Sequence, residues 1–211
     1  AERVLLTGNP IRKSSVAIEG KREEAIHAFG LDLEKKTLLV TGGSLGALTL
    51  NDSIKAGIPA LTAAGIQVIW QCGSYYYEKL QAELGDTLPE SIKLMPFLER
   101  MDYAYAAADV IVARAGAGTI SELCVIGKPV VLVPSPNVAD DHQTKNANAL
   151  VQKHAALMVR DAVAREELVP TVLGLFKDEA KQRELEEQIK MLALADADEV
   201  IAQEVLSLIK K

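Results

Sequence analysis

Short apolar runs alternate with longer amphipathic segments along most of the chain. The runs are continuous and rich in β-branched residues, which is typical of strands buried on both faces of a parallel sheet. They lie at Val4–Thr7, Thr37–Thr41, Gln67–Gln71, Ile92–Met95, Val110–Ala113, Pro129–Val133 and Ala156–Val159. Helical periodicity predicts helices over Lys21–Phe29, Ala47–Ala64, Tyr75–Leu84, Met101–Ala108, Thr119–Ile126 and Gln143–His154. This order predicts an α/β fold, a Rossmann-like doubly wound parallel sheet.

The end of the chain has a different pattern, with no further strand. Helices are predicted over Arg165–Phe176, Glu179–Leu194 and Asp198–Ile209. One face of the last helix carries an apolar stripe of Val200, Ile201, Val205, Leu208 and Ile209. We therefore expect a single domain over residues 1–211, with an α/β core to about residue 164 and a helical tail over residues 165–211.

Composition narrows the class of protein. The chain is 49% hydrophobic and 25% charged, which is typical of a globular domain. Its 23 basic and 29 acidic residues give a net charge of −6, which argues against nucleic-acid binding. No apolar run approaches the ~20 residues of a membrane-spanning helix, and the start has no initiator Met and no signal peptide, so we expect a fragment. Cys72 and Cys124 lie in apolar segments and predict buried thiols in a reducing compartment.

The first loop that could carry chemistry contains Gly42, Gly43, Ser44 and Gly46, between a strand and a helix. Open parallel sheets bind ligands at such carboxyl ends of strands. Glycines let a phosphate approach the backbone, and a helix N-terminus offers unpaired N–H groups. The loop has neither the P-loop pattern nor the GxGxxG spacing. Anion binding and a turn that only reverses the chain both stay open.

The second loop runs from Arg114 to Glu122, again from strand to helix, and includes Gly116 and Gly118. The Glu122 carboxylate could accept hydrogen bonds from a ribose diol. Thr119 and Glu122 also have the spacing of a capping box, which would place Glu122 in the first turn of its helix. The two roles are compatible, and both stay open.

The third loop is polar and ends where a helix begins. Gln143 and Asn146 are spaced to share a helix face, and amides suit sugar hydroxyls because they both donate and accept. Asp140 or Asp141 is the expected N-cap. His142 beside these aspartates does not make a ligand set, so we expect no metal.

The fourth loop, Thr7–Arg12, ends in a guanidinium. Arg12 could pair with a phosphate, or be a surface arginine after a structural turn. The chain contains no GxSxG, no HExxH and no kinase signature. Taken alone, these loops leave the function undecided.

Together the segments TGNPIR, GGSLGALTLN, RAGAGTISELCVIGKPVVLVP and DHQTKNANAL, in this order, are more specific. They resemble the C-terminal half of the peptidoglycan N-acetylglucosaminyltransferases, GT-B enzymes of glycosyltransferase family 28 that convert lipid I to lipid II. The resemblance extends over nearly the whole chain. It implies a donor-binding domain for UDP-N-acetylglucosamine that lacks the N-terminal acceptor domain.

The resemblance also implies roles for individual residues. Arg12 lies near the donor, Ser44 near its phosphates, and the backbone of Leu98 at the uracil edge. The implied nucleotide segment is Ala117, Gly118, Thr119, Ile120, Ser121 and Glu122, with Glu122 on the ribose. Gln143 reads the sugar hydroxyls. Secondary candidates are Gly42, Gly43, Gly46, Gly116, His142 and Asn146. Leu45 departs from the family, which often has Gln there, so any side-chain contact from this position is in doubt.

The implied reaction is an inverting transfer, without cofactor, to lipid I, undecaprenyl-diphosphoryl-N-acetylmuramoyl-pentapeptide. The implied location is cytoplasmic, with the full-length enzyme peripheral on the inner membrane. Because the missing half holds the acceptor site, we expect this chain to bind UDP-N-acetylglucosamine or UDP without turnover and without membrane contact. The apolar stripe of the last helix is expected to pack at the junction with that half.

Two alternatives remain. One is another GT-B enzyme, such as a different UDP-glycosyltransferase or half of a UDP-N-acetylglucosamine 2-epimerase, although no epimerase-like set of carboxylates and histidine can be assigned. The other is a non-catalytic nucleotide-binding module. Binding of donor without turnover would fit both a severed enzyme and such a module, and only rejoining the N-terminal half would separate them.

Overall fold

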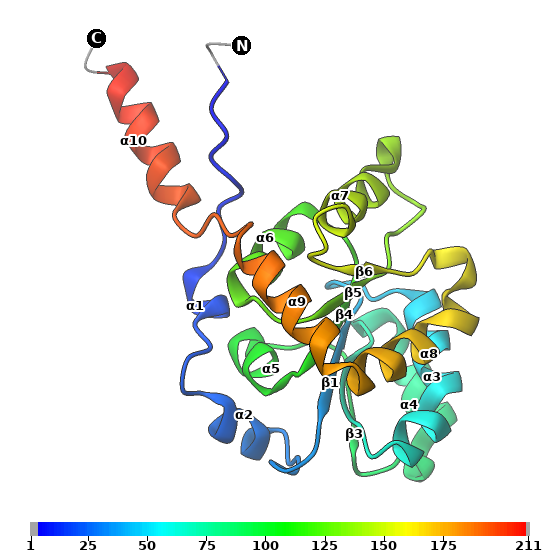
Figure 1. Cartoon of the computed structure of the whole chain (residues 1–211). Coiled ribbons are helices and arrows are strands. Elements are labelled where there is room, and N and C mark those ends of the chain that lie inside the picture. Colours follow the sequence, from blue (N-terminus) through cyan, green and yellow to red (C-terminus); the bar gives the residue numbers. More distant parts are fainter. Residues whose placement is uncertain (1–3, 210–211) are drawn as a thin grey trace.

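A parallel sheet forms the centre of the computed structural model, which describes residues 4–209 apart from the side chain of Asp86. Its strands are β1 (Thr37–Thr41), β2 (Gln67–Gln71), β3 (Ile92–Met95), β4 (Val110–Ala113), β5 (Val130–Leu132) and β6 (Leu157–Met158). They lie in the order β3-β2-β1-β4-β5-β6, and every neighbouring pair is parallel (Figure 1). This is the doubly wound, Rossmann-like order, so the predicted fold class is confirmed.

Helices cover both faces of the sheet (Figure 1). They are α1 (Lys13–Val16), α2 (Arg22–Ala28), α3 (Leu48–Ala63), α4 (Ser74–Leu84), α5 (Met101–Ala107), α6 (Ala117–Ile126), α7 (His142–Val151), α8 (Ala164–Lys177), α9 (Glu179–Lys190) and α10 (Ala197–Ile209). Short 3₁₀ turns lie at Gly85–Thr87, Ala139–Asp141 and Asp161–Val163. The predicted helices are all present, while the short α1 carries too little periodicity to be predicted.

The strands separate the core into two clusters because successive side chains point to opposite faces of a sheet. In β1, Leu38 and Val40 belong to the cluster under α3, α4 and α8. Leu39 between them belongs to the cluster under α2, α5, α6, α7 and α9. All three side chains are fully buried or nearly so. Burial on both faces explains why the strands appear in the sequence as continuous apolar runs.

The three C-terminal helices are held differently. α8 packs on α3, and α9 packs on α6 and α8, with Leu168, Leu185 and Ile189 completely buried. By contrast, α10 projects from the body (Figure 1), and its Leu208 and Ile209 are more than 70% exposed. The base of α10 is held by Lys13 of α1, whose Nζ lies near the carboxylates of Asp196, Asp198 and Glu199. Of the apolar stripe of the last helix, Val205, Leu208 and Ile209 are exposed, whereas Val200 and Ile201 near its base are half-buried.

The strand predicted at Val4–Thr7 is wrong. These residues have no regular secondary structure and lead away from the sheet (Figure 1). Val4 and Leu6 are about 85% exposed. A strand needs a neighbour to complete its backbone hydrogen bonds, and the sheet does not pair with this segment.

Two further expectations concern the thiols and a possible membrane span. Cys72 and Cys124 are buried and unpaired, as predicted. Burial raises the pKa of each thiol to about 11, which makes both unreactive at neutral pH. Within residues 4–209, no helix has the length and apolar character that crossing a membrane requires.

Candidate functional site

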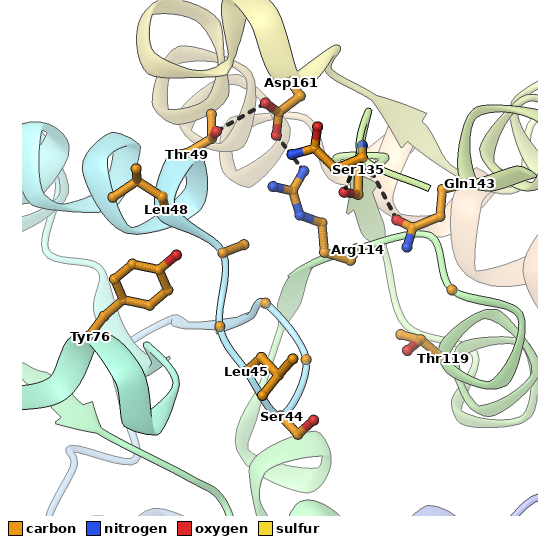
Figure 2. Close-up of a pocket in the computed structure, with 16 residues that line it drawn as sticks. Ser44, Leu45, Leu48, Thr49, Tyr76, Arg114, Thr119, Ser135, Gln143 and Asp161 are labelled. Atoms are coloured by element: carbon orange, nitrogen blue, oxygen red, sulfur yellow. Dashed lines mark hydrogen bonds and ion pairs between the residues drawn. The ribbon is translucent and has the colours of Figure 1, made fainter. Parts of the chain in front are cut away.

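A cavity of about 630 Å³ opens at the carboxyl ends of β1 and β4, the two central strands (Figure 2). The chain leaves β1 toward α3 and leaves β4 toward α6, so this is the point where the strand order reverses. Ligands of doubly wound sheets bind at this position. The cavity is lined by Gly42, Gly43, Ser44, Leu45, Gly46, Ala47, Leu48, Thr49, Tyr76, Arg114, Gly116, Thr119, Ser135, Asn137, Gln143 and Asp161.

The glycines of the first loop are required by the fold itself. Gly43 and Gly46 have φ angles of +83° and +77°, which side chains other than glycine rarely adopt. A Cβ on Gly46 would lie 2.0 Å from the carbonyl oxygen of Cys72, and one on Gly42 would lie 2.6 Å from the nitrogen of Ala47. The structural turn left open by the sequence therefore explains all three glycines without a ligand.

Leu45 lies at the tip of the same loop and is 79% exposed. It lines the cavity beside Ser44 (Figure 2). A leucine side chain has no polar atom, so only the backbone can form hydrogen bonds at this position.

The second loop differs from the sequence prediction. Helix α6 begins at Ala117, with Gly116 as its N-cap, which places Glu122 in the second turn. The capping box of Thr119 and Glu122 is therefore wrong, because the extended backbone of Gly116 starts the helix two residues earlier. Instead of capping the helix, the Glu122 carboxylate accepts a hydrogen bond of 2.9 Å from the Tyr105 hydroxyl.

The start of α6 offers unpaired donors at the cavity. The first N–H groups of an α-helix, here those of Ala117, Gly118 and Thr119, have no acceptor within the helix. A Cβ on Gly118 would meet no atom within 4 Å, and its φ is not positive. Neither packing nor backbone conformation therefore requires a glycine at this position, in contrast to the glycines of the first loop.

Gln143 and Asn146 share a face of α7, as predicted, and both contact the backbone of Ala115, two residues before α6. The Gln143 Oε1 accepts hydrogen bonds from the backbone nitrogens of Ala115 (3.2 Å) and Ser135 (2.9 Å, Figure 2). Asn146 Nδ2 donates to the carbonyl of Ala115 (3.0 Å) and does not line the cavity. Because two backbone donors occupy Oε1, Gln143 has only its Nε2 to offer a ligand.

An ion pair that sequence reasoning missed joins three loops of the site (Figure 2). Arg114 Nη1 contacts Asp161 Oδ1 and also donates to the carbonyl of Val133 (3.0 Å). Asp161 Oδ2 accepts from the hydroxyl of Thr49 at 2.9 Å. Arg114 follows β4 and Asp161 follows β6, so the rule of strand carboxyl ends could have found both. Since Asp161 balances its charge, Arg114 adds no net charge to the cavity.

A second cavity, of about 170 Å³, adjoins the first and shares Gly43, Ser44 and Thr119 with it. It is also lined by Thr41, Gln71, Phe97, Leu98, Met101, Tyr105 and Glu122. The amide of Gln71 connects its walls, since Nε2 donates to the carbonyl of Gly43 (2.9 Å) and Oε1 accepts from the Thr41 hydroxyl (2.6 Å). The structure thus brings together Ser44, Leu98, Thr119 and Glu122 from loops far apart in the sequence.

Arg12 lies outside both cavities. It is exposed at the N-cap of α1, in a groove of about 470 Å³ that it shares with Lys21, Arg100 and Asp102. Met101 lines this groove and also the second cavity, so the two spaces are neighbours. The side chain of Arg12 can approach a ligand only from this adjoining groove.

Ala117 and Gly118 are exposed and line neither cavity, and three other candidates do not present their side chains to either one. Ile120 packs against the core. The Ser121 hydroxyl donates to the carbonyl of Ala117 (3.0 Å) and accepts from Asn9 Nδ2 (3.0 Å). His142 is exposed, and its Nδ1 lies 2.8 Å from the carbonyl oxygen of Ala139.

The start of α7 follows the sequence prediction in position but not in bonding. Asp141 is the N-cap, and Asp140 and Asp141 both have left-handed backbones with φ near +50°. The Asp141 carboxylate accepts a hydrogen bond from the Thr144 hydroxyl (2.6 Å) rather than from a backbone N–H. In the part of the chain that the structure describes, no group of three or more His, Cys, Asp and Glu side chains could hold a metal ion.

The sheet order and the two cavities at the switch point define a doubly wound α/β domain with a ligand site between the starts of two helices. Residues 37–203 match the glycosyltransferase family 28 C-terminal domain. The chain belongs to this family.

Curated relatives cover the whole chain. A UDP-N-acetylglucosamine--N-acetylmuramyl-(pentapeptide) pyrophosphoryl-undecaprenol N-acetylglucosamine transferase of Parabacteroides distasonis is 48% identical over 211 residues, which is 100% of this chain and 57% of that protein. A protein of the same name from Cytophaga hutchinsonii is 50% identical over 208 residues, 99% of this chain and 55% of that protein. The chain thus spans little more than half the length of these relatives.

Solved structures agree with the family. The crystal structure of Acinetobacter baumannii MurG matches with a TM-score of 0.71 and 27% identity, over 99% of this chain and 58% of that one. A UDP-N-acetylglucosamine 2-epimerase from Listeria monocytogenes matches with a TM-score of 0.63 over 89% of this chain and 47% of that one. Its identity is 15%, so this second likeness shows the fold alone.

Proposed function

We propose that this chain is the donor-binding part of an N-acetylglucosaminyltransferase and that it binds UDP-N-acetylglucosamine at the switch point of the sheet. The observation that carries the proposal is the open start of α6. Gly118 leaves free space above unpaired N–H groups, although neither its φ nor its packing calls for a glycine. Such space is useful if a ligand approaches the backbone there.

The diphosphate is assigned to the space between the starts of α3 and α6. Both helices begin at the 630 Å³ cavity, and each contributes unpaired N–H groups and the positive end of its dipole. These donors stabilise the negative charge that develops on the departing diphosphate. Arg12 adds a guanidinium from the adjoining groove, since the charge of Arg114 is balanced by Asp161.

The nucleoside and the sugar are assigned to the two ends of this space. The second cavity holds the nucleoside, with the backbone of Leu98 at the base and the Glu122 carboxylate on the ribose hydroxyls. The sugar lies beside Gln143, whose Nε2 donates to a sugar oxygen because its Oε1 is already engaged. Asn146 supports this arrangement indirectly, because its hydrogen bond to the carbonyl of Ala115 holds the backbone that Gln143 also contacts.

The reaction served by the complete enzyme is an inverting displacement. The 4-hydroxyl of the lipid-linked N-acetylmuramoyl unit of lipid I attacks the anomeric carbon of the donor's N-acetylglucosamine. The bond between that carbon and the diphosphate oxygen breaks, and UDP leaves. The names of the relatives give the donor and the acceptor of such a transfer, and this chain covers 57% of the first of them. The remaining part of such a protein supplies the acceptor site and the base that takes the hydroxyl proton. We therefore expect this chain alone to bind donor without turnover.

Calorimetric titration of the purified chain tests the proposal. UDP-N-acetylglucosamine and UDP are expected to bind, UDP-glucose more weakly than the acetylated sugar, and ADP not at all. Glu122→Ala should weaken UDP and UDP-N-acetylglucosamine alike, whereas Gln143→Ala should weaken only the sugar nucleotide. A chain that binds no uridine nucleotide, or binds ADP equally well, would refute the assignment. Glycosyl transfer by the chain alone would refute the expected lack of turnover.

A further inference from the structure

Tyr105 is a buried phenol whose bonding the proposed function leaves unexplained. It lies on α5 and is 1% exposed. Its hydroxyl donates to Glu122 Oε2 at 2.9 Å. A buried tyrosine hydroxyl needs an acceptor, and a backbone carbonyl would satisfy it at less cost than a carboxylate, which loses hydration on burial. The acceptor chosen here is the carboxylate that lines the second cavity, and Tyr105 lines the same cavity.

This hydrogen bond restricts the carboxylate. A glutamate side chain in solution loses up to about 2 kcal/mol of rotamer entropy when it is held in one conformation. Tyr105 holds Oε2 before any ligand arrives, whereas Oε1 has no hydrogen-bond partner among residues 4–209. A carboxylate with one oxygen anchored and the other open at a cavity wall is pre-organised to accept from a ligand hydroxyl.

The phenol can fulfil this role over the whole working range of pH. Burial, together with the charge of Glu122, raises the pKa of Tyr105 far above its ordinary value. The hydroxyl therefore stays protonated and remains a donor. The rigid ring has no freedom to turn away, since Tyr105 is part of the core cluster under α5 and α6.

We propose that Tyr105 is a positioning residue that holds Glu122 in the orientation in which its carboxylate binds the vicinal hydroxyls of a ribose. The inference rests on the proposed function, because it assigns the 170 Å³ cavity to the nucleoside. Tyr105 itself is not expected to contact the ligand. Its hydrogen bond to Glu122, between α5 and α6, would determine how strongly the site prefers ribose over deoxyribose.

The test compares UDP with 2′,3′-dideoxy-UDP by calorimetry on the wild-type chain, Tyr105→Phe, Glu122→Ala and the double variant. The wild-type chain should prefer UDP about tenfold or more, as expected for hydrogen bonds to a charged group. Tyr105→Phe should reduce this preference by about three- to tenfold, while the affinity for dideoxy-UDP stays within about twofold of wild type. In the Glu122→Ala background, which leaves no side-chain acceptor for Tyr105 to hold, Tyr105→Phe should change the preference no further.

Tyr103→Phe is the matched control. Tyr103 lies on the same helix, and its hydroxyl pairs with Glu24, outside both cavities. Its loss should leave the preference for UDP unchanged, and thermal unfolding of each variant shows that it is folded.

Three results would overturn the inference while leaving nucleotide binding intact. In the first, Tyr105→Phe weakens UDP and dideoxy-UDP by the same factor, as for a purely structural role. In the second, it changes neither affinity. In the third, the wild-type chain binds UDP and dideoxy-UDP equally. If the wild-type chain bound neither nucleotide, the proposed function itself would fail and the inference with it.

Discussion

Replacing Gly118 by alanine should separate stability from binding in an unusual way. The new Cβ would meet no protein atom within 4 Å, and the backbone is already helical. Alanine in a helix is more stable than glycine by up to about 1 kcal/mol, and by less in the first turn. The variant should therefore unfold with the wild-type free energy or one that is higher by roughly 0.5 kcal/mol.

Binding should change in the opposite direction. Gly118 itself lines neither cavity, but the added methyl group stands in the first turn of α6, between Gly116 and Thr119, which line the cavity where we place the diphosphate. Loss of one hydrogen bond to a charged oxygen costs about 1.5–3 kcal/mol, which is a decrease in affinity of roughly 10- to 100-fold. Calorimetry with UDP-N-acetylglucosamine, next to urea unfolding of the same sample, measures both quantities.

Gly174→Ala provides the control for this comparison. Gly174 lies within α8, and a Cβ there also meets no atom within 4 Å, but no residue of α8 lines either cavity. This variant should gain stability and bind the donor as the wild type does. If Gly118→Ala also bound the donor with wild-type affinity, the open start of α6 would not be the diphosphate site.

Three other substitutions test the structure around the site. Gly46→Ala should lower the free energy of unfolding by at least about 2 kcal/mol, because its φ is positive and its Cβ would collide with a carbonyl oxygen; an unchanged urea midpoint would contradict this. Arg114→Met and Asp161→Asn should each cost about 2 kcal/mol, and the double variant less than their sum, whereas additive costs would show no coupling. The pKa of Asp102 is held well below its usual range, first by Arg100, so this group stabilises the fold above pH ~4 and its contribution is lost as the pH falls below that. Asp102→Asn should therefore remove about 1 kcal/mol at pH 7 and clearly less at pH 2, because the contribution disappears completely only when the pH falls through the lowered pKa of the folded state. An equal loss at both pH values would refute the ion pair as its cause.

The sheet was predictable because strands that are buried on both faces appear in the sequence as continuous apolar runs. All six strands begin within one residue of the predicted position, and β1, β2, β3 and β4 have the predicted bounds. Residues Val4–Thr7 show the same apolar pattern, but the sheet offers them no neighbouring strand. Local pattern shows that a segment can form a strand, whereas pairing requires a partner that only the tertiary structure provides.

The loops of the site were also predictable, but not what each residue does in them. The glycines of the two loops looked alike in the sequence, yet Gly42, Gly43 and Gly46 are required by backbone geometry and Gly118 is not. The difference depends on which atoms lie beside each Cα, and those atoms come from other segments, such as the carbonyl of Cys72 beside Gly46.

The sequence by itself determined the fold class, the order of the elements and the loops in which a ligand site would lie, because these follow from periodicity and from the topology of parallel sheets. Only the tertiary structure decided the partners of the charged and polar side chains. Glu122 pairs with Tyr105, 17 residues away, and Arg114 with Asp161, 47 residues away. Periodicity shows which face of an element is buried and not which residue of another element it meets, so these contacts were settled only when the helices packed against the sheet.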